Sequence, residues 1–338
     1  MNTSAMRSNF KCEIDSFRPE DATGIVRLFE AVYGDGYPIK MYYDRDKLSE
    51  ANRTGECLSV VARTPEGRVI GNHNLVRSAP YAYTYEWAAG LVLDEYRAYG
   101  VTGKIVDYML NDLAPRTEIQ EIFGEPTLTQ ILIQKMSVGL KFVETALELG
   151  LLPASLYSKE KPSTERVSTL IQFRAYKPKP QAVFVPRPYE EELRFLYSAL
   201  DDERTLVAAQ DNVQADGAAD IGLAVFDFAR VARVAVNHPG SDFGASFEDV
   251  EKKALDQNVI VIQVWLGLDS PAVSAAVDVL RSKGYFIGGI LPRWFDADGL
   301  LMQKIWFQPD FESLVIHTDR AREIARLAAR DWTRASSQ

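Results

Sequence analysis

The stretch that decides the fold is Glu86–Lys104, which reads EWAAGLVLDEYRAYGVTGK. Its first half is apolar and predicts a strand, and it leads through a polar segment into a turn that contains Gly100 and Gly103. Apolar residues then recur at the three- and four-residue spacing of an amphipathic helix. These residues are Val101, Ile105, Val106, Met109, Leu110 and Leu113. The stretch therefore predicts a strand, a glycine turn and a helix in succession.

A strand that passes through a glycine turn into a helix offers a site for an anion. The first backbone N–H groups of a helix have no intrahelical partner, and the helix dipole favours negative charge beside them. Gly100 and Gly103 let the backbone approach a ligand with no Cβ in the way. The sequence therefore predicts that a phosphate-bearing ligand binds at this turn. The alternative is a structural turn that binds nothing.

Two common phosphate-binding motifs do not fit the turn. A dinucleotide-binding fold requires G-x-G-x-x-G, and the stretch has no such triplet. A P-loop requires Gly-Lys followed by Ser or Thr, with an earlier glycine five positions before the Gly of that pair. Here Gly103-Lys104 is followed by Ile105, and Ala98 stands at the earlier position.

The segment instead resembles the acyl-CoA-binding motif of the GNAT N-acetyltransferase superfamily, an apolar strand followed by [R/Q]-x-x-G-x-[G/A]. Arg97, Gly100 and Thr102 occupy the motif positions, with Gly103 one place late. The resemblance implies that the strand backbone binds the pantetheine arm of acetyl-CoA or another acyl-CoA, and that the loop surrounds the pyrophosphate. The implied contacts are Gly90, Leu91, Val92, Leu93, Arg97, Ala98, Tyr99, Gly100, Val101, Thr102, Gly103 and Lys104, although Lys104 is equally well explained as a solvated surface lysine.

Composition limits the class of protein. A chain of 338 residues is long enough for two domains. The formal net charge of −9 argues against nucleic acid or an anionic membrane as the main partner. Cys12 and Cys57 are too few for a secreted disulfide framework, and no apolar run approaches the length of a membrane span. We expect a soluble, cytoplasmic protein.

The order of elements in the first half also resembles the GNAT order. From the N-terminus we expect a strand at 12–16, a helix from Arg18 to about Tyr33, strands at 58–64 and 69–76, the strand and helix of the opening motif, a strand at 127–135, a helix at 138–149 ended by Gly150, and a strand at 151–157. The sequence ALELGL at 146–151 takes the place of the superfamily's helix-ending signature. The resemblance covers residues from about 12 to 176.

A Pro-rich connector separates a second set of elements from the first. We expect a helix at 189–200, strands near 206–209 and 222–236, a helix at 247–257, a strand at 259–266, a helix at 270–282, strands at 285–291 and 301–307, and a terminal helix at about 318–335. The helix at Phe247 is preceded by Asn237–Asp242 and not by an Arg-x-x-Gly turn, so this half is expected to have lost acyl-CoA binding.

The predicted fold class is α/β (α+β), with two GNAT-like domains in tandem, each a mixed, mostly antiparallel twisted sheet flanked by helices. The predicted domains are residues 1–176, which bind acyl-CoA, a linker at 177–188, and a degenerate GNAT-like domain with its C-terminal helix at 189–338.

Glu86 is the candidate general base, because it begins the motif strand where some GNAT enzymes carry a catalytic glutamate. The alternative is an ordinary strand glutamate. Many GNAT enzymes place a proton-donating tyrosine four residues before the glycine of the helix-ending signature, and counting from Gly150 gives Ala146. Either another group serves, with Tyr157, Tyr99 and Tyr96 as spare candidates, or the thiolate leaves unassisted. His73, on a predicted central strand, is expected to be structural.

The acceptor pocket is predicted from aromatic loops. Tyr37 and Tyr42 lie in the loop 36–43, where GNAT proteins shape their substrate pocket, and Trp294 lies in the loop 292–299 of the second half. Asp296 and Asp298 do not complete an EF-hand, so no metal is expected.

The sequence therefore predicts an N-acyltransferase that moves an acyl group from acyl-CoA to the amine of a small molecule. The alternative is a non-catalytic, regulatory acyl-CoA-binding protein. A homodimer is left open.

Overall fold

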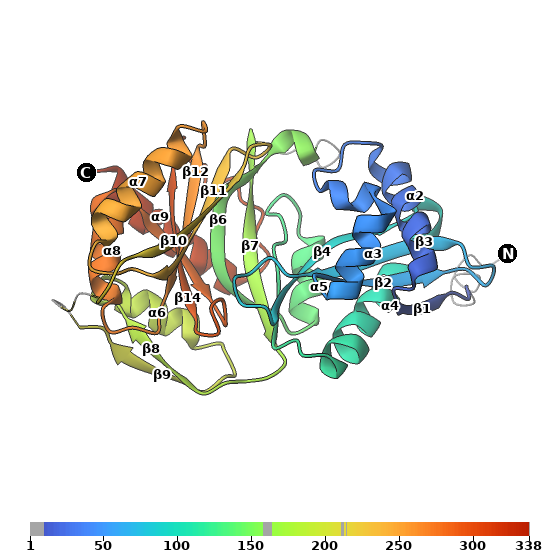
Figure 1. Cartoon of the computed structure of the whole chain (residues 1–338), viewed down its shortest axis with the longest axis horizontal. Helices are drawn as coiled ribbons and strands as arrows, with labels where there is room; N and C mark the ends of the chain where they lie inside the picture. The colour runs from blue at the N-terminus through green and yellow to red at the C-terminus, as the bar shows by residue number, and fades with distance from the viewer. Residues whose placement is uncertain (1–9, 158–163, 211–212, 214, 338) are drawn as a thin grey trace. The chain divides into compact units, whose positions relative to one another are not determined.

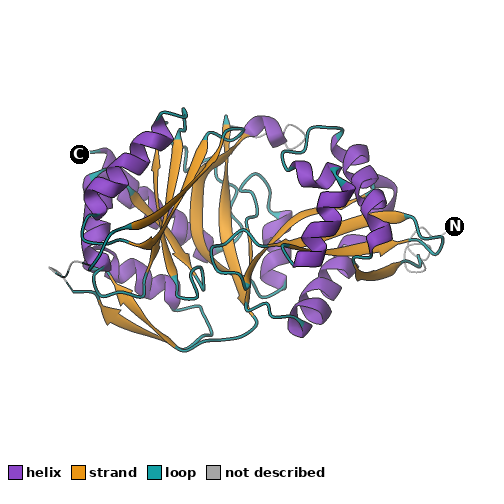
Figure 2. Ribbon diagram, viewed as in Figure 1, coloured by secondary structure: helices purple, strands orange, loops and turns teal. Residues whose placement is uncertain are grey.

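A computed structural model of the chain describes residues 10–157, 164–210, 213 and 215–337. Contacts between residues divide the chain into two units, Met1–Ile122 and Phe123–Gln338, here called unit 1 and unit 2. Each combines β-strands with helices, so the predicted α/β class with a mixed sheet is confirmed (Figure 2).

The sheet of unit 1 is an antiparallel meander. Its strands are β1 (Glu13–Ser16), β2 (Cys57–Arg63), β3 (Val69–Val76) and β4 (Thr84–Val92), each paired with the next (Figure 1). The helices are α2 (Ala22–Tyr33), α3 (Arg45–Thr54) and α4 (Val101–Asp107), which a π-helical turn extends over Tyr108–Leu113. Short 3-10 turns lie at Pro19–Asp21, Lys40–Tyr43, Asp94–Tyr99 and Ala114–Arg116. The strand β5 (Glu121–Gly124) spans the division between the units.

Alternation along the strands places helices on both faces of this sheet. Val61 on β2 packs in one core with Phe29 of α2 and Leu48 of α3. The helix α4 covers the opposite face of the sheet, because Gly71 on β3 lies directly against the side chains of Val101 and Ile105. A Cβ at Gly71 would stand 3.0 Å from the Ile105 side chain, so the glycine lets α4 sit close to the sheet.

In unit 2 hydrogen-bonded strands follow one another in the order β7 (Arg166–Ala175), β6 (Val143–Pro153), β13 (Phe286–Leu291), β14 (Gly299–Ile305), β12 (Val261–Gly267), β11 (Val231–His238) and β10 (Asp220–Phe226). The pair β11–β12 is parallel and the other neighbours are antiparallel. The helices are α5 (Leu132–Gly139), α6 (Glu190–Tyr197), α7 (Phe243–Leu255), α8 (Val273–Ser282) and α9 (Asp319–Ser336). A separate parallel pair is formed by β8 (Gln181–Val185) and β9 (Arg204–Ala208), and 3-10 turns lie at Ala154–Tyr157 and Arg187–Tyr189.

The elements predicted after residue 189 are confirmed in type and order, except that the single strand predicted at 222–236 is two antiparallel strands, β10 and β11. The helix α7 connects the parallel strands β11 and β12, and β14 lies between β12 and β13. The terminal helix α9 is amphipathic and buries Ala321, Ile324 and Ala328 in the core of unit 2.

The prediction for residues 127–149 was wrong, and the strand predicted at 151–157 is confirmed only for 151–153, which form the end of β6. The predicted strand at 127–135 gives way to α5, the predicted helix at 138–149 is strand β6 from Val143, and β7 was missed. The sequence of β6, VETALELGLLP, is rich in helix-forming residues, but its side chains are buried almost throughout. Pairing with β7 and β13 therefore overrides the local helix propensity.

The division between the units falls upstream of the predicted Pro-rich connector. Residues 177–188 include β8, which buries Val183 and Val185, and the connector sequence did not predict this strand. The connector as a domain boundary stays a prediction.

Trp294, predicted to contact the acceptor, lies in the core of unit 2 instead. Its side chain is 1% exposed, and its ring centroid lies 4.9 Å from that of Phe123 and 5.0 Å from that of Trp265. Phe173 completes the aromatic cluster at 6.1 Å. This burial differs from the predicted role, because a side chain enclosed by other rings presents no surface to a ligand.

Replacing Trp294 with alanine is expected to lower the free energy of unfolding by about 3–5 kcal/mol, because it leaves a large cavity in a packed aromatic cluster. Trp306→Ala is the control, since Trp306 is 40% exposed and should cost less than about 1 kcal/mol. Urea denaturation followed by circular dichroism measures both. A Trp294→Ala protein as stable as the wild type would contradict the assignment of this side chain to the core.

Candidate functional site

The central feature of unit 1 is a bulge in β4. Gly71 and Asn72 on β3 pair with Val92 and Leu91 on β4, but Asn74 pairs with Ala88. Three steps along β4 therefore correspond to two along β3, which leaves one extra residue in β4. Ala89, in the bulge, has a left-handed backbone with φ of +50°. Such a bulge bends its strand and removes backbone groups from the ladder.

A buried polar network holds the bulge. The side-chain amide of Asn74 donates to the carbonyl oxygen of Ala89 over 3.1 Å. Its oxygen accepts from the Ser59 hydroxyl over 2.7 Å, and the backbone N–H of Ser59 donates to Asn52 on α3 over 2.9 Å. Ser59 and Asn74 are buried, and a buried network in which each polar group is satisfied fixes one conformation.

Gly90 in the bulge is required by a close approach to His73. A Cβ at Gly90 would stand 2.0 Å from the His73 ring. Nδ1 of His73 accepts a hydrogen bond from Nε1 of Trp87 over 3.0 Å, and burial lowers the pKa of His73 to about 4. His73 is therefore neutral near pH 7 and packs beneath the bulge, in agreement with its predicted structural role.

Beyond the bulge the chain forms an open turn. Gly100 has φ of +70° and is the N-cap residue of α4, which has no side-chain cap. An added Cβ at Gly100 or Gly103 would meet nothing within 4 Å. The first N–H groups of the helical run from Val101 to Leu113 therefore lie beside unobstructed backbone, as the anion-site prediction requires.

Two cations flank the turn. Arg97 bonds the Val92 carbonyl oxygen over 3.2 Å and pairs with Asp94 over 3.0 Å, and Lys104 donates to the carbonyl oxygen of Phe10 over 3.3 Å. Both basic side chains are exposed, and an exposed ion pair contributes little, so a phosphate can compete with Asp94 for Arg97.

The implied acyl-CoA contacts fall into two groups. The side chains of Leu91, Val92 and Val101 are buried in the core of unit 1, so these residues offer only backbone to a ligand. The second group is accessible: Gly90, Arg97, Ala98, Gly100, Gly103 and Lys104 are exposed, and Leu93, Tyr99 and Thr102 are half-buried. A ligand at this place would therefore meet the backbone of β4 and the exposed, basic turn that follows it.

Glu86 lies on β4, opposite Val76, and is half-buried. Burial raises the pKa of Tyr42 well above its ordinary value, and among the smaller contributions is the negative charge of the Glu86 carboxylate. The carboxylate of Glu86 therefore lies close enough to influence Tyr42, one of the two tyrosines predicted to line the acceptor pocket.

The structure brings Tyr37 and Tyr42 together on Phe29 of α2. Tyr42 stacks on Phe29 at 4.4 Å and is 1% exposed, whereas Tyr37 meets the same ring edge-on at 5.1 Å and is half-buried. Tyr42 is thus a core residue, which differs from its predicted role as an open pocket wall. Sequence reasoning missed Tyr33, which is exposed and lies 5.0 Å from Tyr37. The signal for it was its place on the apolar periodicity of α2.

Ala146 was predicted as the tyrosine position by counting back four residues from Gly150, on the assumption that Gly150 ends a helix. Gly150 does not end a helix. Gly150 lies inside β6, and Ala146 is buried there between Ile171 and Gly289. The helix that precedes β6 is α5, which ends at Gly139. The same count from Gly139 gives Lys135, an exposed residue that is not a tyrosine either.

The corresponding place in unit 2 is closed to a ligand of this kind. The parallel strands β11 and β12 pair without interruption from Val231–Val261 to Val236–Leu266, so both edges of β11 are occupied. Asp242 precedes α7, where its carboxylate accepts from the N–H of Ala219 over 2.7 Å, and this bond lowers the pKa of Asp242. A fixed negative charge at this helix start opposes phosphate binding.

The described residues contain neither a membrane-spanning helix nor a cluster of metal ligands. None of their helices is both long and apolar enough to cross a bilayer. Their His, Cys, Asp and Glu side chains form no group of three or more that is arranged to hold a metal ion.

Comparison with known proteins gives structural likeness only. No protein-family model matches the chain, and no curated protein sequence matches it. Among solved structures, an N-acetyltransferase from Staphylococcus aureus Mu50 covers 49% of this chain and 99% of its own, with 14% identity and a TM-score of 0.40. The ribosomal-protein-S18-alanine N-acetyltransferase of Escherichia coli covers 50% and 96%, with 12% identity and a TM-score of 0.39. The ribosomal-protein-S5-alanine acetyltransferase of Vibrio fischeri covers 49% and 96%, with 12% identity and a TM-score of 0.39.

Replacing Gly90 with alanine is expected to lower the free energy of unfolding by about 1–3 kcal/mol, because the added methyl collides with the buried His73 ring. Gly103→Ala is the matched control: its Cβ enters open space on a helix, where alanine is favoured over glycine by about 1 kcal/mol. Thermal denaturation of the two variants measures the difference. Equal melting temperatures for both would show that the bulge does not depend on Gly90.

Proposed function

We propose that this chain is an N-acyltransferase that moves an acyl group, in the first instance acetyl, from acyl-CoA to the amine of a small molecule. The observation that carries the proposal is the sequence of features in unit 1: the bulge in β4, the open Gly100 turn and the uncapped start of α4. The exposed Arg97 and Lys104 supply positive charge at the same turn.

Acyl transfer requires that a thioester be held beside an amine and that the amine lose a proton. The backbone of β4 next to the bulge holds the extended arm of the donor, and the Gly100 turn holds its phosphates. When both substrates are bound, the amine nitrogen attacks the thioester carbon, the carbon–sulfur bond breaks and the sulfur departs as thiolate. A thiol is acidic enough to leave in this form without a protein acid, which removes the need for a tyrosine at Ala146 or Lys135.

Glu86 is the proposed general base. It lies on the same strand as the bulge, and its half-buried position leaves the carboxylate reachable. The proton lost by the attacking amine passes to this carboxylate. Tyr37, half-buried over Phe29, is proposed as an acceptor wall; Tyr42 supports it from the core.

A second candidate is a regulatory protein that binds acyl-CoA without turning it over. The absence of a tyrosine at Ala146 and at Lys135 favours this candidate. Thiol release from acetyl-CoA over a panel of amines, amino acids and peptides separates the two. Binding without thiol release above the protein-free rate for every amine would favour the regulatory candidate.

Acetyl-CoA is expected to bind one site per chain, and Gly100→Glu should abolish binding. The substitution places a side chain and a negative charge where the phosphates lie. Gly67→Glu is a close control, because Gly67 also has positive φ and open space around its Cα but lies in the β2–β3 turn. Isothermal titration calorimetry gives both affinity and stoichiometry. Undiminished binding in Gly100→Glu, or two equivalent sites in the wild type, would refute this assignment.

Glu86→Gln is expected to lower the turnover number by about 10²–10⁴, the usual contribution of a general base, and to leave the acetyl-CoA dissociation constant unchanged. The exposed Glu20→Gln is the control for loss of one carboxylate. Steady-state thiol release as a function of pH measures the effect, and the acidic limb of the profile should disappear in Glu86→Gln. Near-full turnover at saturating substrates would reduce Glu86 to a structural residue.

A further inference from the structure

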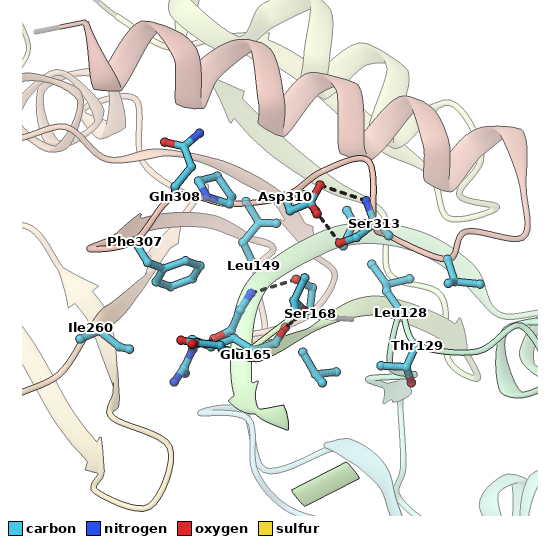
Figure 3. Close-up of a pocket in the computed structure, with 17 residues that line it drawn as sticks. Leu128, Thr129, Leu149, Glu165, Ser168, Ile260, Phe307, Gln308, Asp310 and Ser313 are labelled. Atoms are coloured by element: carbon cyan, nitrogen blue, oxygen red, sulfur yellow. Dashed lines mark hydrogen bonds between the residues drawn. The ribbon is translucent and has the colours of Figure 1, made fainter. Parts of the chain in front are cut away.

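Unit 2 contains a cavity of about 550 Å³, within the range of small-molecule pockets. It lies between the end of β6, the start of β7 and the segment that follows β14 (Figure 3). Leu128, Leu149, Ile260 and Phe307 form apolar walls, and Ser168 lies between them. The proposed acyl transfer uses none of these residues.

Arg166 brings to the cavity wall a positive charge that forms no ion pair among the described residues. Its guanidinium donates to three backbone carbonyl oxygens: those of Gly150, Leu151 at 3.1 Å and Ala229 at 2.8 Å. Within the described residues no carboxylate lies within ion-pair distance of Arg166. Burial lowers the pKa of Arg166 to about 10, and the nearby positive charge of Arg230 contributes. The group is still charged near pH 7, and a half-buried charge without a counter-ion is costly.

Ser168 offers a neutral donor in the same wall. Its oxygen accepts a hydrogen bond from the backbone N–H of Gly150 over 2.9 Å, and Ser168 is 8% exposed. A serine hydroxyl has one hydrogen to donate besides its lone pairs. The accepted bond does not use that hydrogen, so the hydroxyl keeps a donor that a ligand can use.

Gly150 brings these groups together with an aromatic surface. Its φ is +56°, and a Cβ there would stand 2.3 Å from the ring of Phe307. The ring therefore lies against the backbone that bonds both Arg166 and Ser168, and the Arg166 guanidinium is 5.9 Å from the ring centroid. A cation, a hydroxyl donor and an apolar surface thus meet at one end of the cavity.

We propose that this cavity binds a small monoanionic carboxylate with an apolar body. The carboxylate accepts hydrogen bonds from Arg166 and Ser168, and the body lies among Phe307, Leu149 and Leu128. Glu165 and Asp310 also line the cavity and repel any anion, so a polyanion such as a phosphate, with its larger charge, fits less well than a single carboxylate held at the Arg166 end. The site is independent of the proposed acyl transfer.

Phenylacetate is the probe, and phenylacetamide is its uncharged counterpart of similar shape. Isothermal titration of the full chain should give phenylacetate a dissociation constant of about 1 mM or below, and phenylacetamide should bind at least about tenfold more weakly. Equal affinities for the two probes, or no binding of phenylacetate, would overturn the proposal.

Two variants locate the binding. Arg166→Met keeps the apolar stem and removes the charge, so it should weaken phenylacetate at least about tenfold and leave phenylacetamide unchanged. Arg194→Met, on the exposed face of α6, is the matched control and should bind as the wild type does.

Because Arg166 also holds three carbonyl groups, Val315→Trp serves as a second variant. Val315 lines the cavity and is 36% exposed, so a tryptophan there fills space without removing a side-chain hydrogen bond. A folded Val315→Trp protein that retains full affinity for phenylacetate would place the probe elsewhere and overturn the proposal.

Discussion

The candidate site in unit 1 depends on one extra residue in β4. A regular strand would satisfy all its backbone groups with neighbouring strands, and the bulge at Ala89 and Gly90 turns part of the backbone out of that ladder. The bulge persists because Asn74 binds the Ala89 carbonyl from below and because Gly90 has no Cβ to strike His73. Removing either support would favour a regular strand, and a regular strand leaves little for a ligand to bind.

The bulge also explains why buried polar residues are concentrated beneath β4. Asn74 and Ser59 would cost free energy in an apolar core if they were unpaired. Here Ser59 donates to Asn74, and Asn74 donates to the irregular backbone at Ala89. Burial likewise keeps His73 neutral, so it accepts from Trp87 without bringing a charge under the site. Polar groups that would weaken an ordinary sheet therefore stabilise this one.

The sequence predicted the order of strand, turn and helix at residues 86–104 because hydrophobic period and glycine placement are local signals. It failed at residues 127–149, where β6 is rich in helix formers and pairing with its neighbours makes it a strand. That error moved the expected tyrosine to Ala146. Register is also not local, so the bulge could not be read from the sequence. Tyr42 and Trp294 were predicted to line a ligand pocket because they lie in loops. A single sequence does not distinguish a loop that packs into the core from a loop that faces a ligand, and both side chains are buried.

The two anion sites proposed for the described residues, the Gly100 turn of unit 1 and the cavity of unit 2, differ in how far their positive charges are buried. In unit 1 the donors are exposed backbone groups, with Arg97 and Lys104 in solvent, where charges are screened over about 8–10 Å at ordinary salt. Binding there should weaken as salt rises, and a long ligand with several charges gains most from it. In unit 2 the single cation, Arg166, is half-buried and tied to three carbonyl groups, so it is screened less and cannot move to follow a ligand. A chain with a net charge of −9 repels anions in general. Each proposed site therefore has to supply its own local charge, and the two proposals assign a large polyanion to the exposed site and a small monoanion to the half-buried one.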